Sequence, residues 1–319
     1  MFRKKIIGLL IGLTILLFGC VSSSEIHTVV PDSTPRSTPR STPRLAIISA
    51  FEPELKELLR QTEIDHTTII NGRSFHTGQL AGNDVVLFMS GVSMVNAAMT
   101  TQTVLDHFDV NGIVISGIAG GVNPDLNIGD VIIPDQWGQY QEQFFARETN
   151  DGWDLGRHSD EFSNYGMMFP QKVSVTRKGD NPDSEKEHFW FQVDPEMLTV
   201  AQQVVEKVQL NECAWLGKCL ETKPTVIIGG NGVSGPTFVD NAHYRDWVWD
   251  TFQANALDME SASVAHVAYV NDVPFIAFRS LSDLAGGGSG VNEINVFFQL
   301  ASDNSAEVVI AFLEVWGER

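Results

Sequence analysis

Carboxylates in three short segments are the residues of this chain best suited to chemistry. Glu54 lies in the segment AFEPE, and Asp258 and Glu260 lie two residues apart in LDMES. Asp283 ends the third segment, RSLSD. A buried carboxyl group can act as a general acid or base, because burial raises its pKa toward neutral pH. Each also has an ordinary structural explanation, since acidic residues cap helices and stabilise their first turn. One carboxylate alone therefore does not predict a function.

A glycine-rich segment, SGIAGGVNPDLNIGDVIIP, runs from Ser116 to Pro134. Glycines 117, 120 and 121 would let the backbone approach a flat or sugar-like ligand closely. The segment lacks the spacing GxGxxG, and no acidic ribose ligand follows it, which argues against a nicotinamide dinucleotide site. A plain tight turn is the alternative explanation.

The elements that must position these residues alternate along the chain. Short apolar runs predict buried strands at residues 45–48, 85–89, 113–116, 225–228 and 275–278. Apolar residues at helical spacing predict helices over 52–59, 94–108 and 196–208, and a last helix that packs Val309, Phe312, Leu313 and Trp316. Strands that alternate with helices predict an α/β sheet with parallel strands. The chain has 319 residues, 43% of them hydrophobic, which suits one large or two small domains.

Residues 136–194 break this pattern, because they are rich in aromatic residues and irregularly spaced. We expect an insertion near the carboxyl edge of the sheet, where open α/β folds bind ligands. An oligomer interface would explain the same aromatic residues equally well.

The N-terminus has the features of an export signal. Arg3, Lys4 and Lys5 precede an apolar stretch that is too short for a transmembrane helix. The stretch ends in Leu-Phe-Gly-Cys, which resembles the lipobox of bacterial lipoproteins, with Cys20 as the lipidated residue. We therefore expect a signal peptide over 1–19 and an extracytoplasmic, membrane-anchored lipoprotein. An ordinary signal peptide with a chance cysteine is the alternative.

A linker over residues 20–44 follows, and it contains three STPR repeats. Proline at every fourth position favours extended chain, so the folded domain should comprise residues 45–319. That domain carries 15 basic and 38 acidic residues. An excess of negative charge this large repels phosphate backbones, so we expect no nucleic-acid partner.

The two remaining cysteines, Cys213 and Cys219, are separated by five residues. This spacing does not match a CxxC redox or zinc motif, and we expect no metal site. Because an exported protein can keep a disulfide, we favour a structural disulfide between them over two free thiols.

Four motifs in one order point to a family. SGIAGG, NIGDVIIP, DMES and LSDLAGG together make the chain resemble the nucleoside phosphorylase and nucleosidase superfamily, especially methylthioadenosine/S-adenosylhomocysteine nucleosidases. GVSMVNAAMTTQ, VSGPTFVDNAHYR and SDLAGGGS further resemble the exported plant bark-storage-protein branch. The resemblance implies a single α/β domain whose twisted mixed central sheet is flanked by helices. It implies no cofactor and an assembly that is commonly dimeric or higher.

The resemblance also implies a mechanism for cleaving purine nucleosides. Asp283 would hold or protonate N7 of the base, and Glu54 would activate the attacking water. Glu260 would hold the ribose hydroxyls. The family implies further substrate-binding residues. They are Met259 against the sugar, Phe238 stacked on the base, Val239 supplying backbone contacts, Ser90, Ala119 and Gly120 in the walls of the sugar and base pocket, and Ser282 supporting Asp283.

Two other functions remain open from the sequence. A phosphate-dependent nucleoside phosphorylase would need cationic groups, but the segments AFEPE and FMSGVSMVN contain no arginine or lysine. A non-catalytic nucleoside-binding or storage protein would need fewer acids in an apolar pocket. We therefore expect a nucleosidase that uses water.

Overall fold

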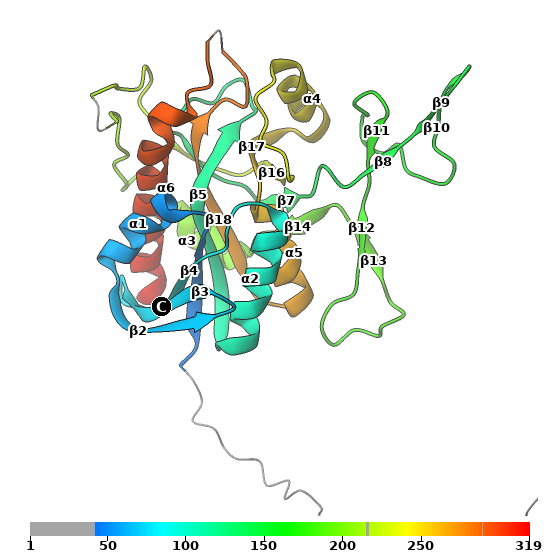
Figure 1. The fold of residues 1–319 in the computed structure, drawn as a ribbon. Coiled ribbons are helices and arrows are strands. Elements are labelled where there is room, and N and C mark those ends of the chain that lie inside the picture. The colour runs from blue at the N-terminus through cyan, green and yellow to red at the C-terminus, as the bar shows by residue number, and fades with distance from the viewer. Residues whose placement is uncertain (1–41, 215–216, 289) are drawn as a thin grey trace, which may run out of the picture. The chain divides into compact units, whose positions relative to one another are not determined.

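A computed structural model describes residues 42–214, 217–288 and 290–319. The expected signal peptide, Cys20 and most of the STPR linker lie outside the described residues. A single mixed sheet organises the described chain, as the family resemblance implied (Figure 1). Its main path runs, in sheet order, through β14 (Trp190–Gln192), β7 (Gln136–Gly138), β16 (Asn231–Ser234), β17 (Ala254–Asp258), β5 (Val110–Gly121), β1 (Arg44–Ser49), β4 (Asn83–Met89), β3 (Arg73–Leu80) and β2 (Glu63–Ile70).

A further branch of the sheet starts at β5. The strand β18 (Phe275–Asp283) pairs parallel with β5 and antiparallel with β6 (Val131–Ile133), which pairs with β15 (Val226–Ile228). All nine residues of β18 are buried: its first four are apolar, whereas its second half also buries the polar residues Arg279, Ser280, Ser282 and Asp283. The sheet is mixed because β17 runs antiparallel to β5, whereas β1 and β18 run parallel to it.

Helices cover both faces of the sheet. The helix α1 (Glu52–Gln61) packs against α6 (Ile294–Gly317) on one face, and α2 (Met94–His107) packs against α5 (Ser261–Asn271) on the other (Figure 1). Two further helices, α3 (Pro195–Gln202) and α4 (Ala242–Phe252), are capped by Asp194 and Asn241. Of the helices in the described ranges, α6 alone is long and apolar enough to cross a membrane. Because 67% of its apolar window is buried in the protein, we assign it to the core.

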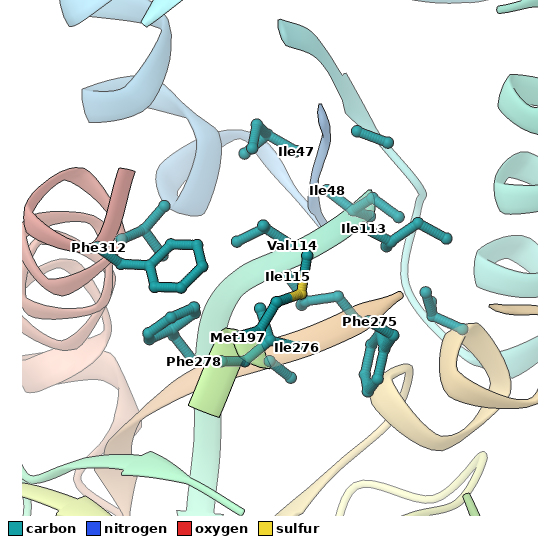
Figure 2. Packing of buried hydrophobic residues seen from close by; sticks show 14 of the residues in the cluster. Ile47, Ile48, Ile113, Val114, Ile115, Met197, Phe275, Ile276, Phe278 and Phe312 are labelled. Carbon is teal, nitrogen blue, oxygen red and sulfur yellow. The ribbon is translucent and has the colours of Figure 1, made fainter. Parts of the chain in front are cut away.

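The main core forms where the central strands meet α6 and α3. Figure 2 shows Ile47 and Ile48 from β1, Val114 from β5 and Phe278 from β18 in this core, with Phe278 beside Phe312 of α6. All these side chains are at most 1% exposed. This packing fixes the relative positions of β1, β5 and β18, and these three strands lead into the segments with the carboxylates and glycines.

The observed elements differ from the sequence predictions in three ways. Both β5 and β18 continue through the motifs that were expected to follow them, so SGIAGG is a strand and not a tight turn. The hairpin β2–β3 was not predicted, because its first strand is largely exposed and lacks an apolar face. The helix α3 ends at Gln202, and the chain continues to Lys207 in turns that still bury Val204.

The insertion over 136–194 consists of β7 and β14, which join the main sheet, and three small hairpin sheets that extend from it (Figure 1). These pair β8 (Gln143–Phe145) with β11 (Met168–Pro170), β9 (Arg147–Thr149) with β10 (Gly152–Asp154), and β12 (Val173–Val175) with β13 (Lys186–His188). Outside this segment, Cys213 and Cys219 form a disulfide, as we expected.

Candidate active site

A cavity of about 180 Å³ lies where β5, β17 and β18 end. Its walls come from segments that are far apart in the sequence. The lining residues are Ala50, Phe51, Glu54, Val92, Ile118, Ala119, Gly120, Thr237, Phe238, Val239, Leu257, Asp258, Met259, Glu260, Ser282, Asp283 and Ile294. Most are apolar, and four of the six polar ones are carboxylates. An apolar lining with a few convergent polar groups is the usual composition of a small-molecule site. No residue of the 136–194 insertion lines the cavity, so that segment does not form this site.

Glu54 reaches the cavity from the first turn of α1, and its side chain is only 1% exposed. The backbone amide of Ala50 donates to its Oε2 at 2.6 Å, and that of Ile118 donates to its Oε1 at 2.7 Å. Burial raises the pKa of Glu54, while Arg279 and the backbone hydrogen bonds partly oppose the rise. These contacts fix the direction of the carboxylate, and the raised pKa suits a general base.

Arg279 is a residue whose role the sequence analysis missed. It lies in the middle of β18, is fully buried, and pairs with three carboxylates. Its Nε lies 2.7 Å from Oδ2 of Asp258, its Nη2 lies 3.4 Å from Oε2 of Glu260, and its Nη1 lies 3.5 Å from Oε1 of Glu54. Burial works against the charged form, but the three carboxylates raise the pKa of Arg279 above its ordinary value. One guanidinium therefore neutralises part of an acidic cluster.

Asp258 anchors this cluster. Its carboxylate accepts hydrogen bonds from the hydroxyls of Ser234 and Ser261 and from the backbone amides of Glu260 and Ser261. Every oxygen of Asp258 is thus occupied within the protein. We conclude that Asp258 holds Arg279 in place and is not free to act on a ligand.

Glu260 precedes α5 and is 6% exposed. Burial raises the pKa of Glu260 to about 7, and the negative charges of Asp258 and Glu54 add to this effect while Arg279 opposes it. The backbone amide of Ser93 donates to Oε1 of Glu260 at 2.7 Å. Glu260 is therefore held on both oxygens, by Ser93 and by Arg279, with one edge toward the cavity.

Asp283 ends β18 on another side of the cavity and is 3% exposed. Its Oδ1 accepts from the backbone amide of Ala285 at 2.8 Å, and its Oδ2 accepts from the hydroxyl of Ser282 at 2.9 Å. Burial raises the pKa of Asp283, and these hydrogen bonds together with the one from Asn292 oppose the rise. The contact to Ala285 lies in a turn, so Asp283 does not cap a helix. A carboxyl group that keeps its proton to higher pH can serve as a general acid.

Gly117 explains part of the glycine-rich motif. A β-carbon at this position would overlap both Nη1 of Arg279 and Oε1 of Glu54. The absence of a side chain there gives the guanidinium and the carboxylate room to approach each other. The expectation that this glycine would admit a ligand is therefore wrong for Gly117, which admits protein side chains instead.

Nine of the ten predicted catalytic and substrate-binding residues line the cavity. Ser90 is the exception, because it is fully buried and its hydroxyl donates to the carbonyl of Gly91. It supports the loop before α2 and does not form a wall of the cavity. Phe238 lines the cavity and is 52% exposed.

The order of the β-strands and the lining of the cavity define an α/β protein with a small cavity between buried carboxylates. The family model described as "Phosphorylase superfamily" matches residues 44–314, and the chain belongs to this superfamily. It is 31% identical over 272 residues to the 5'-methylthioadenosine/S-adenosylhomocysteine nucleosidase of Tolumonas auensis, covering 85% of this chain and 98% of the relative. It is also 28% identical over 255 residues to bark storage protein A of Populus deltoides, covering 78% of this chain and 80% of the relative.

A solved structure agrees with the fold. The 5'-methylthioadenosine/S-adenosylhomocysteine nucleosidase from Colwellia psychrerythraea 34H, in complex with adenine, superimposes with a TM-score of 0.64. It has 25% sequence identity and covers 86% of this chain and 96% of the other. The single-domain mixed-sheet fold that the motifs implied is thereby confirmed.

Proposed function

We propose that this chain is an exported, lipid-anchored purine nucleosidase that hydrolyses the N-glycosidic bond of adenine nucleosides of the methylthioadenosine and S-adenosylhomocysteine type. The single observation that carries the proposal is the convergence of Glu54 and Asp283 on one cavity. They lie at opposite ends of the domain sequence, and burial raises the pKa of both. The names of the relatives support the substrate class.

Asp283 activates the leaving base. Its carboxyl group, which burial keeps protonated to higher pH, donates to N7 of the purine as the bond between N9 and the anomeric carbon breaks. A protonated base is a better leaving group, because the negative charge that develops on it is neutralised. Ser282 orients the carboxyl through its hydroxyl.

Glu54 activates the water. As the bond breaks, the sugar gains oxocarbenium character, and a water molecule held by Glu54 adds to the anomeric carbon while its proton passes to the carboxylate. The products are free adenine and the sugar with a hydroxyl at the anomeric carbon. The backbone amides of Ala50 and Ile118 hold Glu54 for this step.

The remaining lining residues bind the substrate. Glu260 accepts hydrogen bonds from the ribose hydroxyls, and Met259 packs against the sugar. Phe238 stacks on the base, Val239 contacts its edge through the backbone, and Ala119 with Gly120 forms the opposite wall. Only those contacts that are stronger in the transition state than in the ground state accelerate cleavage of the N-glycosidic bond.

Water is favoured over phosphate as the nucleophile by the charges at the cavity. None of the described residues that line it is a lysine or an arginine. Arg279 lies behind the wall, and its guanidinium is already paired with three carboxylates. A phosphate dianion would face Glu54 and Glu260 with no cation of its own.

A chromatographic screen of nucleosides tests this function. The purified domain should release adenine from methylthioadenosine, S-adenosylhomocysteine or adenosine without phosphate. Added phosphate should neither speed the reaction nor yield a sugar 1-phosphate, and a phosphate requirement would identify a phosphorylase. Binding of these nucleosides with no release of base would identify a non-catalytic binding protein.

Export and anchoring rest on the N-terminal sequence. The basic residues, the short apolar stretch and the lipobox-like segment before Cys20 support a membrane-anchored lipoprotein outside the cytoplasm. Cys20→Ser should release or misprocess the protein. If membrane fractionation is unchanged and the N-terminal peptide carries no lipid mass, the anchor is wrong.

A homo-oligomer is also part of the proposal. Exposed apolar side chains gather on α2 and the loop before it, including Val92, Val95 at 80% exposure, and Met99. A second copy of the chain packed there would remove them from water. Light scattering on the purified domain should give a mass above that of one chain, and a monomer at micromolar concentration would contradict it.

A further inference from the structure

The loop between β4 and α2 holds a serine in a conformation that normally requires glycine. Ser93 has φ 80° and ψ 158°. This region of backbone space is essentially restricted to glycine, because a β-carbon meets the neighbouring peptide groups there. Such strain persists only where the surrounding structure enforces it, and it is concentrated at functional sites.

The strained backbone turns the amide of Ser93 toward the cavity. Its N–H donates to Oε1 of Glu260 at 2.7 Å, while the other oxygen of Glu260 lies 3.4 Å from Arg279. A hydrogen bond to a carboxylate is stronger than one between neutral groups. The amide of Ser93 therefore fixes the oxygen of Glu260 that Arg279 does not hold.

The same residue is the N-cap of α2, because its carbonyl accepts the first helical hydrogen bond from Ala97. Serine is among the best N-cap residues, since its hydroxyl usually accepts from an amide in the first turn of the helix. Here Ser93 makes no such side-chain hydrogen bond. Ser93 could instead adopt an ordinary N-cap conformation, in which its hydroxyl accepts from an amide in the first turn of α2. That conformation competes with the observed one, and it would move the backbone amide of Ser93 away from Glu260.

Hydrogen bonds from Asn96 and Thr100 stabilise the rest of the loop between β4 and α2. Asn96 donates to the carbonyl of Val92 at 2.7 Å, and Arg73 donates to Oδ1 of Asn96 at 3.2 Å. Thr100 donates to the carbonyl of Ser90 at 3.0 Å. These contacts hold both sides of Ser93 and explain how a strained residue is maintained.

We propose that Ser93 is a positioning residue for the ribose, whose strained backbone holds Glu260 through its amide in competition with capping of α2. The proposal rests on the proposed function, because Glu260 is the residue assigned to the ribose hydroxyls. The hydroxyl of Ser93 has no part in binding; it stabilises only the competing conformation. The identity of residue 93 therefore sets how firmly the site holds a ribonucleoside.

Substitutions of Ser93 can distinguish the observed conformation from the competing capped conformation. Glycine adopts the observed conformation without strain, whereas threonine keeps the capping hydroxyl but is β-branched and disfavours positive φ more than serine does. All affinities are measured by calorimetry in the Asp283→Asn background, so that adenosine is bound but not hydrolysed during the titration. Relative to that background, the affinity for adenosine should be equal or higher with Ser93→Gly and at least tenfold lower with Ser93→Thr. The difference should disappear for 2',3'-dideoxyadenosine, which has no hydroxyl for Glu260 to bind.

The control is Asn71→Thr, which imposes a β-branched residue at φ 51° in the exposed turn between β2 and β3. Asn71→Thr should lower thermal stability without changing the ratio of the affinity for adenosine to the affinity for 2',3'-dideoxyadenosine. If Ser93→Thr does not fold, Ser93→Ala replaces it. Alanine removes the hydroxyl that stabilises the competing conformation, so Ser93→Ala should bind adenosine more tightly than the protein with Ser93, and an unchanged affinity would contradict the proposal.

Three results would overturn the proposal. The first is a folded Ser93→Thr with the same ratio of adenosine to 2',3'-dideoxyadenosine affinity as the protein with Ser93. The second is a tenfold loss of adenosine affinity in Ser93→Gly or Ser93→Ala, which would mean that the hydroxyl itself contacts the ligand. The third is a wild-type protein that binds no adenosine. A wild-type protein that binds adenosine but releases no adenine would refute the hydrolysis alone, and the affinity series would still test Ser93.

Discussion

Replacing Arg279 by methionine would test the acidic cluster most directly. Methionine approximates the length of the side chain but removes the only cation that contacts Glu54, Asp258 and Glu260 in the structure described here. Breaking a buried ion pair from one side costs about 3–5 kcal/mol, because the remaining charges stay buried without a partner. Domains are stable by only about 5–15 kcal/mol, so Arg279→Met should remove a large part of the free energy of unfolding.

The loss should depend on pH in a defined direction. Arg279 lowers the pKa of Glu54 and Glu260, so its removal raises both further above their unfolded values. The folded state then binds protons more tightly than the unfolded state, and stability falls as the pH rises through this interval. The deficit of Arg279→Met relative to wild type should therefore be larger at pH 8 than at pH 5.5.

Thermal unfolding measures both effects. For a domain of this size, a loss of 1 kcal/mol lowers the melting temperature by about 2–4 °C. At pH 8 the melting temperature of Arg279→Met should therefore lie about 10 °C below that of the wild type. Arg60→Met is the matched control, because Arg60 pairs with Glu57 on the exposed surface and its loss should leave the melting temperature unchanged. An equal deficit at both pH values, or a deficit no larger than that of the control, would refute the assigned role of the cluster.

Further predictions concern the reaction and the disulfide. Glu54→Gln and Asp283→Asn should each lower kcat about 10²- to 10⁴-fold with substrate binding retained, and a tenfold or smaller drop in both would remove them from the chemistry. Glu260→Gln should raise KM as well, because Glu260 binds the ribose before and during the reaction; an unchanged KM would contradict that role. The rate should be bell-shaped in pH, rising as the raised pKa of Glu54 is passed and falling as that of Asp283 is passed, and a flat profile between pH 5 and 8 would count against both. Reducing the bond between Cys213 and Cys219 should cost about 2 kcal/mol in urea unfolding, as expected for so short a loop, and no change in the midpoint would contradict this.

The sequence contained a sign that Arg279 is buried and paired, although the sequence analysis did not use it. Arg279 directly follows the apolar run 275–278, in a segment that continues the same buried strand. A charge in such a strand must be paired, so an acidic partner could have been predicted. Which carboxylates pair with it could not be predicted, because Glu54 is more than 200 residues away in the sequence and approaches only through the pairing of β1, β5 and β18.

The class of fold could be predicted from the sequence, and the family resemblance of its motifs predicted nine of the residues that line the cavity. Apolar periodicity is a local property of the chain, so it can be read from neighbouring residues. The motifs can be recognised in the same way, because they consist of given residue types in a given order. The contacts among these residues became visible only in the folded structure. It showed that Gly117 makes room for side chains and that Asp258 is fully occupied, and it revealed the strain at Ser93. Contacts across the sheet and backbone dihedral angles depend on packing between distant segments, which no local pattern encodes.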